Sequence, residues 1–162
     1  MGDGDGWVEC SCGQRHWGRH GAVGLLLVWA DGAQARVLVQ HRAAWTHGGG
    51  LWGLPGGARD SHESLVQAAL REAGEEAGPV CADAEVTATL EGTDHGDWRY
   101  DYVVARVPAP LAPVANDESE ALTWVDLRDV PDLPLLPALA ADWPRLREAA
   151  LPAPTTADPN RP

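Results

Sequence analysis

The stretch 57–79 constrains this chain more than any other part of its sequence, because it concentrates carboxylates at helical spacing. Glu72 and Glu76 are four residues apart and Glu75 follows Glu72 by three, so a helix would place all three side chains on one face. Like charges at this spacing destabilise a helix by about 0.2–0.5 kcal/mol per pair. Arg71 is the only cation close by. Clustered carboxylates are typical ligands of a hard divalent cation, so the pattern favours a metal-binding face.

The same stretch resembles the Nudix box, the motif G-x5-E-x7-R-E-U-x-E-E-x-G-U, in which U is a bulky aliphatic residue. Every fixed Gly, Glu and Arg of the motif is present at the required spacing. The two departures are Ala73, which is small for the first aliphatic position, and Pro79, which replaces the last one. Neither departure affects a carboxylate, so the chain is identified as a member of the Nudix family. An acidic helix that binds no metal is the alternative.

The resemblance implies a divalent cation, Mg²⁺ or Mn²⁺, and a set of ligands for it. The implied ligands are two main carboxylates, one further carboxylate and one backbone carbonyl, which belong to Glu72, Glu76, Glu75 and Gly57 respectively. Such a cation neutralises charge that develops on a pyrophosphate and activates water for attack at phosphorus. The resemblance also implies that Arg71 braces Glu63 and Glu75 from behind the metal site.

A general base is also required, and the family takes it either from the box or from a loop before a late strand. Within the box, the candidates are Glu72 and Glu75. Glu118 and Glu120 occupy the loop before the strand that we predict over residues 121–125. The sequence leaves this choice open, and a solvated acidic loop is the alternative interpretation of Glu118 and Glu120.

The segment before the box extends the resemblance to bacterial MutT, the family member that hydrolyses nucleoside triphosphates. Arg42 and His47 repeat an Arg–His pair with the same separation in that protein, where it precedes a similar turn. The turn of this chain, which would line the substrate site, consists of Leu54, Pro55, Gly56 and Gly57. The resemblance implies phosphate contacts by Arg42, which suits bidentate binding, and by His47. The alternatives are a surface charge at a strand end for Arg42 and a loop imidazole for His47.

The resemblance to MutT is weaker in the part of the site that would recognise the nucleotide base. MutT reads its purine with an Asn after the last strand, whereas residues 131–144 contain none. Trp45, Trp52 or Trp98 could stack on a base instead. Because the chain has eight Trp, we expect most of them to belong to the core.

The hydrophobic pattern predicts an α/β protein in one domain. Residues 21–30 form a continuous apolar run, which is typical of a strand buried on both faces. The box helix is expected to begin near Ser61 or His62, with Ser61 and Ser64 as candidate caps. Further strands are expected over residues 36–42, 85–91, 98–107 and 121–125, and a final helix over 138–151 is expected to break at Pro144. The expected organisation is an N-terminal extension (1–20), a Nudix domain (21–151) and a disordered tail (152–162). The resemblance implies an α/β/α sandwich with a mixed sheet.

The N-terminal extension contains a possible metal motif, C-x-C-x3-H-x3-H, formed by Cys10, Cys12, His16 and His20. Four such ligands could hold zinc. The spacing is tighter than in common zinc knuckles, so we favour reduced thiols and surface imidazoles and keep zinc as the alternative.

Charge and length limit the partners. The net charge is −12 and all twelve cations are Arg, so nucleic acid and anionic membranes are not expected as partners. The longest apolar run is too short to span a bilayer, and three cysteines give no disulfide framework, which together predict a cytoplasmic protein. We expect a monomer or homodimer with a small nucleotide as its substrate.

These observations predict a Nudix hydrolase that cleaves a pyrophosphate bond of a nucleoside diphosphate linked to another group. A nucleoside triphosphate is the leading substrate class, and it could be an oxidised one such as 8-oxo-dGTP. A pyrophosphatase of ADP-ribose or nucleotide sugars is the alternative enzyme. A nucleotide-sensing module without turnover and a zinc-stabilised interaction domain are the alternatives outside the enzyme class.

Overall fold

The strand β3 (Ala22–Asp31) forms the centre of the protein, and its first seven residues are all buried. The structure is a computed structural model that describes residues 2–151. Residue 1 and residues 152–162, the tail predicted to be disordered, lie outside the described residues. Burial of β3 on both faces of the sheet explains why its sequence is continuously apolar and does not alternate, as its pattern predicts.

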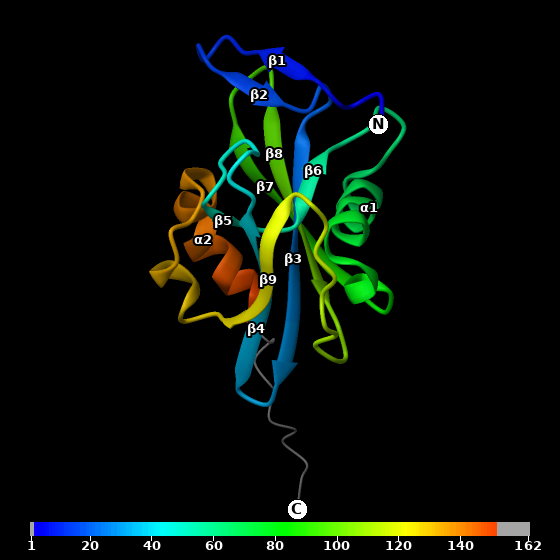
Figure 1. The fold of residues 1–162 in the computed structure, drawn as a ribbon, viewed down its shortest axis with the longest axis vertical. Coiled ribbons are helices and arrows are strands. Elements are labelled where there is room, and N and C mark those ends of the chain that lie inside the picture. Colours follow the sequence, from blue (N-terminus) through cyan, green and yellow to red (C-terminus); the bar gives the residue numbers. More distant parts are fainter. Residues whose placement is uncertain (1, 152–162) are drawn as a thin grey trace, which may run out of the picture.

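The remaining elements surround this strand (Figure 1). The other strands are β1 (Trp7–Glu9), β2 (Arg15–Trp17), β4 (Gln34–Arg42), β5 (Trp52–Gly53), β6 (Gly56–Ala58), β7 (Glu85–Asp94), β8 (Arg99–Arg106) and β9 (Ser119–Asp126). The α-helices are α1 (Leu65–Ala77) and α2 (Pro137–Ala150), and the 3₁₀ turns are Pro79–Cys81 and Val130–Asp132. Neither α-helix of the described chain has the length and apolar content that crossing a membrane requires.

The main sheet is mixed and has seven strands. The order along the sheet is β5-β4-β3-β8-β7, while β6 pairs with β3 and β9 pairs with β4. The β3–β8 pair is parallel and the other pairs are antiparallel. β4 pairs with β3 only over Val28–Asp31 of β3, and β6 pairs with Ala22–Gly24 at the other end. The box glycines on β6 therefore enter the sheet where β3 and β4 have separated.

The helices cover opposite faces of this sheet (Figure 1). Val23, Leu25 and Leu27 of β3 pack with α1, whereas Leu26 and Val28 pack with α2. The α1 face consists of small residues, Ala68, Ala69, Ala73 and Ala77, all fully buried. Small side chains let the helix axis approach the sheet closely, which accounts for Ala at the first aliphatic position of the box. The α/β/α sandwich with a mixed sheet is confirmed.

Both helices differ in detail from expectation. The α1 helix begins at Leu65 rather than near Ser61, and Ser64 is its cap, in a capping box with Gln67. The α2 helix runs through Pro144 without a break, so the expected interruption was wrong. Pro144 and Ala140 are both exposed, so the Ala140 carbonyl that loses its helical partner faces solvent. Solvation of that carbonyl lowers the cost of proline inside the helix.

Candidate active site

The Glu76 carboxylate is the most buried charge of the box. The residue is 3% exposed, and Glu76 Oε2 accepts a hydrogen bond of 2.8 Å from the Gly56 amide. Burial raises the pKa of Glu76 to about 8, with a further increase from the charge of Glu72, although the Gly56 hydrogen bond opposes both. A neighbouring cation would relieve this penalty, which suits the position to a metal ligand.

The Glu72 carboxylate lies against the backbone of the other box glycine. A methyl group placed on the Gly57 Cα would lie 2.6 Å from Glu72 Oε2, so only glycine leaves room for the carboxylate here. Burial also raises the pKa of Glu72, in opposition to its hydrogen bond with Arg71. Glu72 and Glu76 thus project from α1 onto successive residues of β6.

Arg71 links three segments around these carboxylates. Its guanidinium donates two hydrogen bonds to Glu63, of 2.6 and 2.8 Å, one of 2.8 Å to Glu72 and one of 3.0 Å to the Ala58 carbonyl. The Arg71 hydrogen bonds lower the pKa of Glu63 to about 2. Glu75 is 3.7 Å from the same guanidinium but its side chain is 60% exposed. Contacts of Arg71 with Glu63 and Glu75 were expected, and its contact with Glu72 was not.

The donor set suits Mg²⁺ or Mn²⁺ in chemistry. Glu72, Glu75 and Glu76 offer only hard oxygen atoms, and the charges of the buried Glu76 and the partly buried Glu72 repel each other. Within the described residues, the three carboxylates do not gather their oxygens within 4.8 Å of one another. Glu72 and Glu76 both lie against β6, whereas Glu75 lies at the exposed edge.

Arg42 and His47 belong to one loop but do not present their side chains together. Arg42 ends β4, and its Nε donates 2.9 Å to the backbone carbonyl of His47. The His47 ring packs edge-on against Trp7, with centroids 5.6 Å apart. The loop after β4 is thus held by two contacts at His47: its carbonyl accepts from Arg42, and its ring packs on Trp7 of the N-terminal hairpin.

Two candidate bases lie at the start of β9 and differ in their contacts. Glu120 Oε2 is 3.3 Å from His41 Nδ1. The Glu118 carbonyl accepts from the Ala43 amide, and the same loop is joined to the end of α1 because Asn116 donates to the Glu75 carbonyl. Glu118 is therefore carried on a loop tied both to the strand end at Ala43 and to the carboxylate helix, whereas Glu120 is engaged by an imidazole.

The three tryptophans proposed for base stacking lie in different environments. Trp52 stacks on His41 with centroids 4.8 Å apart, and Trp98 stacks on His16 and donates to the Trp17 carbonyl. Trp45 is 71% exposed on the loop after β4. Among them, Trp45 has the most freely accessible ring.

Sequence reasoning missed two residues beside the carboxylates. Gln40 is fully buried on β4, its Nε2 donates to Ser119, and its Oε1 has no hydrogen-bond partner within the described residues. Tyr100 lies on β8, where Gly24 of β3 leaves room for its hydroxyl. The sequence signal for Gln40 was weak, because His41 and Arg42 follow it directly and make it look like part of a polar strand end.

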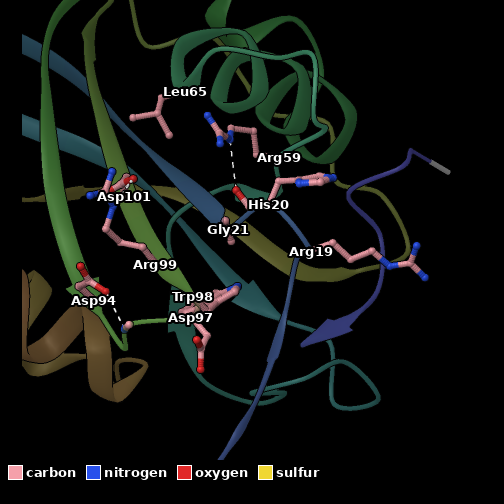
Figure 2. Close-up of a pocket in the computed structure, with 12 residues that line it drawn as sticks. Arg19, His20, Gly21, Arg59, Leu65, Asp94, Asp97, Trp98, Arg99 and Asp101 are labelled. Carbon is pink, nitrogen blue, oxygen red and sulfur yellow. Dashed lines mark hydrogen bonds and ion pairs between the residues drawn. The ribbon is translucent and has the colours of Figure 1, made fainter. Parts of the chain in front are cut away.

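A separate cavity of about 370 Å³ lies beside the start of α1 and excludes all box carboxylates (Figure 2). Its charged lining comprises Arg19, Arg59, Arg99, Asp94, Asp97 and Asp101. Arg99 is paired with Asp101 at 3.0 Å, and Arg59 donates to the His20 carbonyl (Figure 2). Because Asp residues balance the arginines, the lining gives no strong preference for an anion.

Comparisons with known proteins identify the family to which this chain belongs. The sequence model described as NUDIX domain matches residues 18–148. A Mycobacterium tuberculosis protein named "Putative 8-oxo-dGTP diphosphatase 3" is 53% identical over 91% of this chain and 71% of its own length. The crystal structure of RenU, a Nudix hydrolase from M. smegmatis, is 50% identical with a TM-score of 0.84, covering 93% of this chain and 98% of that one. The NUDIX domain of Shewanella oneidensis NrtR, solved with ADP ribose, is 27% identical with a TM-score of 0.58, covering 83% and 88%. The chain therefore belongs to the Nudix family and is a pyrophosphohydrolase.

Proposed function

We propose that the protein hydrolyses a pyrophosphate bond of a nucleoside triphosphate in a reaction that requires Mg²⁺ or Mn²⁺. The observation that carries the proposal is the pair of carboxylates, the partly buried Glu72 and the buried Glu76, against the backbone of Gly57 and Gly56. An oxidised purine nucleotide such as 8-oxo-dGTP is the leading substrate, and the name of the M. tuberculosis relative supports it.

The cation would be held by Glu72 and Glu76, with the Gly57 carbonyl and Glu75 as further ligands, and would neutralise charge on the phosphates. The chain prepares these ligands in advance. The Gly56 amide fixes the Glu76 carboxylate, and Arg71 fixes that of Glu72. A ligand held in position loses little freedom when the substrate arrives, which favours the transition state.

Glu118 is our preferred general base for the attacking water. Its loop is tied to the carboxylate helix and to Ala43 next to the end of β4, whereas Glu120 is occupied by His41. Within the box, the Glu75 carboxylate is 3.7 Å from the Arg71 guanidinium, which competes with a water for its oxygen.

Arg42 and His47 would bind the phosphates of the substrate. Support comes from the hydrogen bond between the Arg42 Nε and the His47 carbonyl, which fixes the loop and leaves the two terminal guanidinium nitrogens of Arg42 for other partners. A triphosphate carries more negative charge at its end than ADP-ribose does, so these contacts favour the triphosphate.

The experiment compares kcat/KM on 8-oxo-dGTP, dGTP and ADP-ribose with Mg²⁺ at one pH. We expect Arg42→Ala to lose a charge-assisted contact worth about 1.5–3 kcal/mol on the triphosphates, which is roughly 10- to 150-fold. The loss on ADP-ribose should be smaller, and His47→Ala should show the same preference more weakly. Arg36→Ala is the matched control, because Arg36 lies on the same strand but packs over Trp29.

Equal losses on all substrates would overturn the phosphate assignment. Turnover of ADP-ribose well above that of the triphosphates would favour the alternative, a pyrophosphatase of ADP-ribose or nucleotide sugars. The similarity to the NrtR domain that was solved with ADP ribose is the reason to test this substrate. Binding without any turnover would favour the sensing module.

A further inference from the structure

The N-terminal segment brings three soft metal ligands together. The Sγ atoms of Cys10 and Cys12 and a ring nitrogen of His16 lie within 4.8 Å of one another. Cys12 Sγ and His16 Nε2 are 3.2 Å apart. His20, the fourth member of the sequence motif, lines the cavity of Figure 2 instead. Three residues of the four-residue motif therefore form a cluster, and His20 does not belong to it.

The turn between β1 and β2 creates this cluster. The Gly13 amide donates to the Cys10 carbonyl and the Cys10 amide donates to the Gln14 carbonyl, which closes a tight loop. Gly13 has φ of 84°, a conformation that favours glycine. The Cys12 amide points at Cys10 Sγ, at 3.5 Å. A tight turn with an amide directed at sulfur stabilises a thiolate, which is the form that binds metal.

The His16 ring is held in place from outside the hairpin. It stacks on His95 with centroids 4.3 Å apart and on Trp98 with centroids 4.4 Å apart. The Cys10 thiol donates to the His95 carbonyl, at 3.4 Å. The turn between β7 and β8 therefore positions both ends of the cluster, and the Cys10 thiol gives up its hydrogen bond to His95 when it becomes a metal-binding thiolate.

We propose that Cys10, Cys12 and His16 bind a zinc ion. Tetrahedral zinc with thiolate and imidazole ligands places their donor atoms about 3.5–3.8 Å apart, and the cluster already approaches these separations. Binding releases the two thiol protons to solvent, and water can occupy the fourth position. Sulfur ligands select zinc over Mg²⁺, so this site is independent of the carboxylates on α1.

The hairpin needs such a clamp because its own packing is poor. β1 and β2 have three residues each and form a separate two-stranded sheet. A hairpin of this size is marginal in water on its own. Trp7 and Trp17 pack on each other but both remain exposed. Zinc would close the turn of the hairpin and hold the His16 ring against the β7–β8 turn, and the stabilised hairpin would keep Trp7 against His47.

The test uses the full chain without an affinity tag, supplied with zinc and then dialysed against metal-free buffer. Metal analysis should find stoichiometric zinc in the parent protein and none in Cys10→Ser/Cys12→Ser. Cys81→Ser and His20→Ala are matched controls that should keep the zinc, since Cys81 lies next to α1 and His20 lies outside the cluster.

Cobalt(II) substitution gives a second, spectroscopic readout. The parent should show the visible absorption of tetrahedral cobalt and a thiolate charge-transfer band, and His16→Ala should lose or shift the visible bands. Hydrogen exchange of the amides in β1 and β2 should speed up when the zinc is removed by a chelator. Absence of zinc from the reconstituted parent, or its retention by the double serine variant, would overturn the proposal.

Discussion

Gly57→Ala tests whether the position of the Glu72 carboxylate controls activity. The added methyl group would lie 2.6, 2.7 and 2.9 Å from the three carboxylate atoms of Glu72, whereas ordinary contact begins at 3.4 Å. The carboxylate must therefore move by about 0.8 Å. Gly57 itself adopts a backbone conformation that alanine tolerates, and its carbonyl is retained.

The cost follows from the precision that catalysis demands. A displacement of about 1 Å at a catalytic group can reduce the rate by about 100-fold, which corresponds to about 2.7 kcal/mol of transition-state stabilisation. Glu72 cannot simply rotate away, because its Oε1 accepts a hydrogen bond of 2.8 Å from Arg71. We therefore expect kcat/KM to fall about 100-fold and the concentration of Mg²⁺ needed for half-maximal rate to rise.

The matched control is Gly74→Ala in α1. A methyl group on Gly74 would meet nothing within 4 Å, and alanine in a helix interior is about 0.5–1 kcal/mol more favourable than glycine. This variant should melt slightly higher and keep full activity. Parent-like kcat/KM in Gly57→Ala, with its melting temperature unchanged, would refute the reasoning that the carboxylate must keep this position.

Two further substitutions test the charges of the fold. Glu76→Gln keeps the shape of a buried side chain but removes a negative charge that the metal would bind. We expect kcat to fall by orders of magnitude, with an intact fold by urea denaturation. Substantial remaining activity would contradict the metal assignment. Arg145→Ala removes the partner of the buried Asp142, 2.7 Å away, and should lower the midpoint of urea denaturation, because the Asp142 carboxylate loses its ion-pair partner. Arg147→Ala on the exposed side of the same helix is the comparison, and equal losses in the two variants would show that the ion pair adds nothing.

The sequence alone predicted those parts of the site that depend on local spacing. Gly57 falls on β6, Arg71 to Glu76 fall on α1 and Gly78 caps the helix end, as their spacing requires, while Glu63 lies in the loop before α1. The start of α1 was harder to predict, because Ser61 and Ser64 are both suitable caps. Ser61 is bound instead by Asp3, from a distant part of the chain, and this leaves Ser64 to cap the helix.

Contacts between distant segments account for the remaining differences. Nothing local to Trp7 indicates that its ring packs on His47, since the two residues meet only when the hairpin folds over the loop. In the same way, the pairing of Glu120 with His41 depends on the register of β9 against β4. Residue spacing predicts which side chains share a face of one helix or strand, whereas contacts between distant segments depend on how the whole sheet is assembled.

The parallel pairing of β3 with β8 determines when this protein can fold during its synthesis. Residues 22–28 of β3 pair with residues 100–106 of β8, which are synthesised much later. The pairing of β4 with β9 likewise requires a strand that is synthesised later. Chains whose contacts join distant residues fold slowly, because a long loop must close before the contacts form. A nascent chain that has left the ribosome only as far as the box helix thus has β4 and β6 to pair with β3, but lacks β8 along the other edge of this apolar strand. During that interval β3 is the segment most exposed to aggregation, and it is where a chaperone would bind.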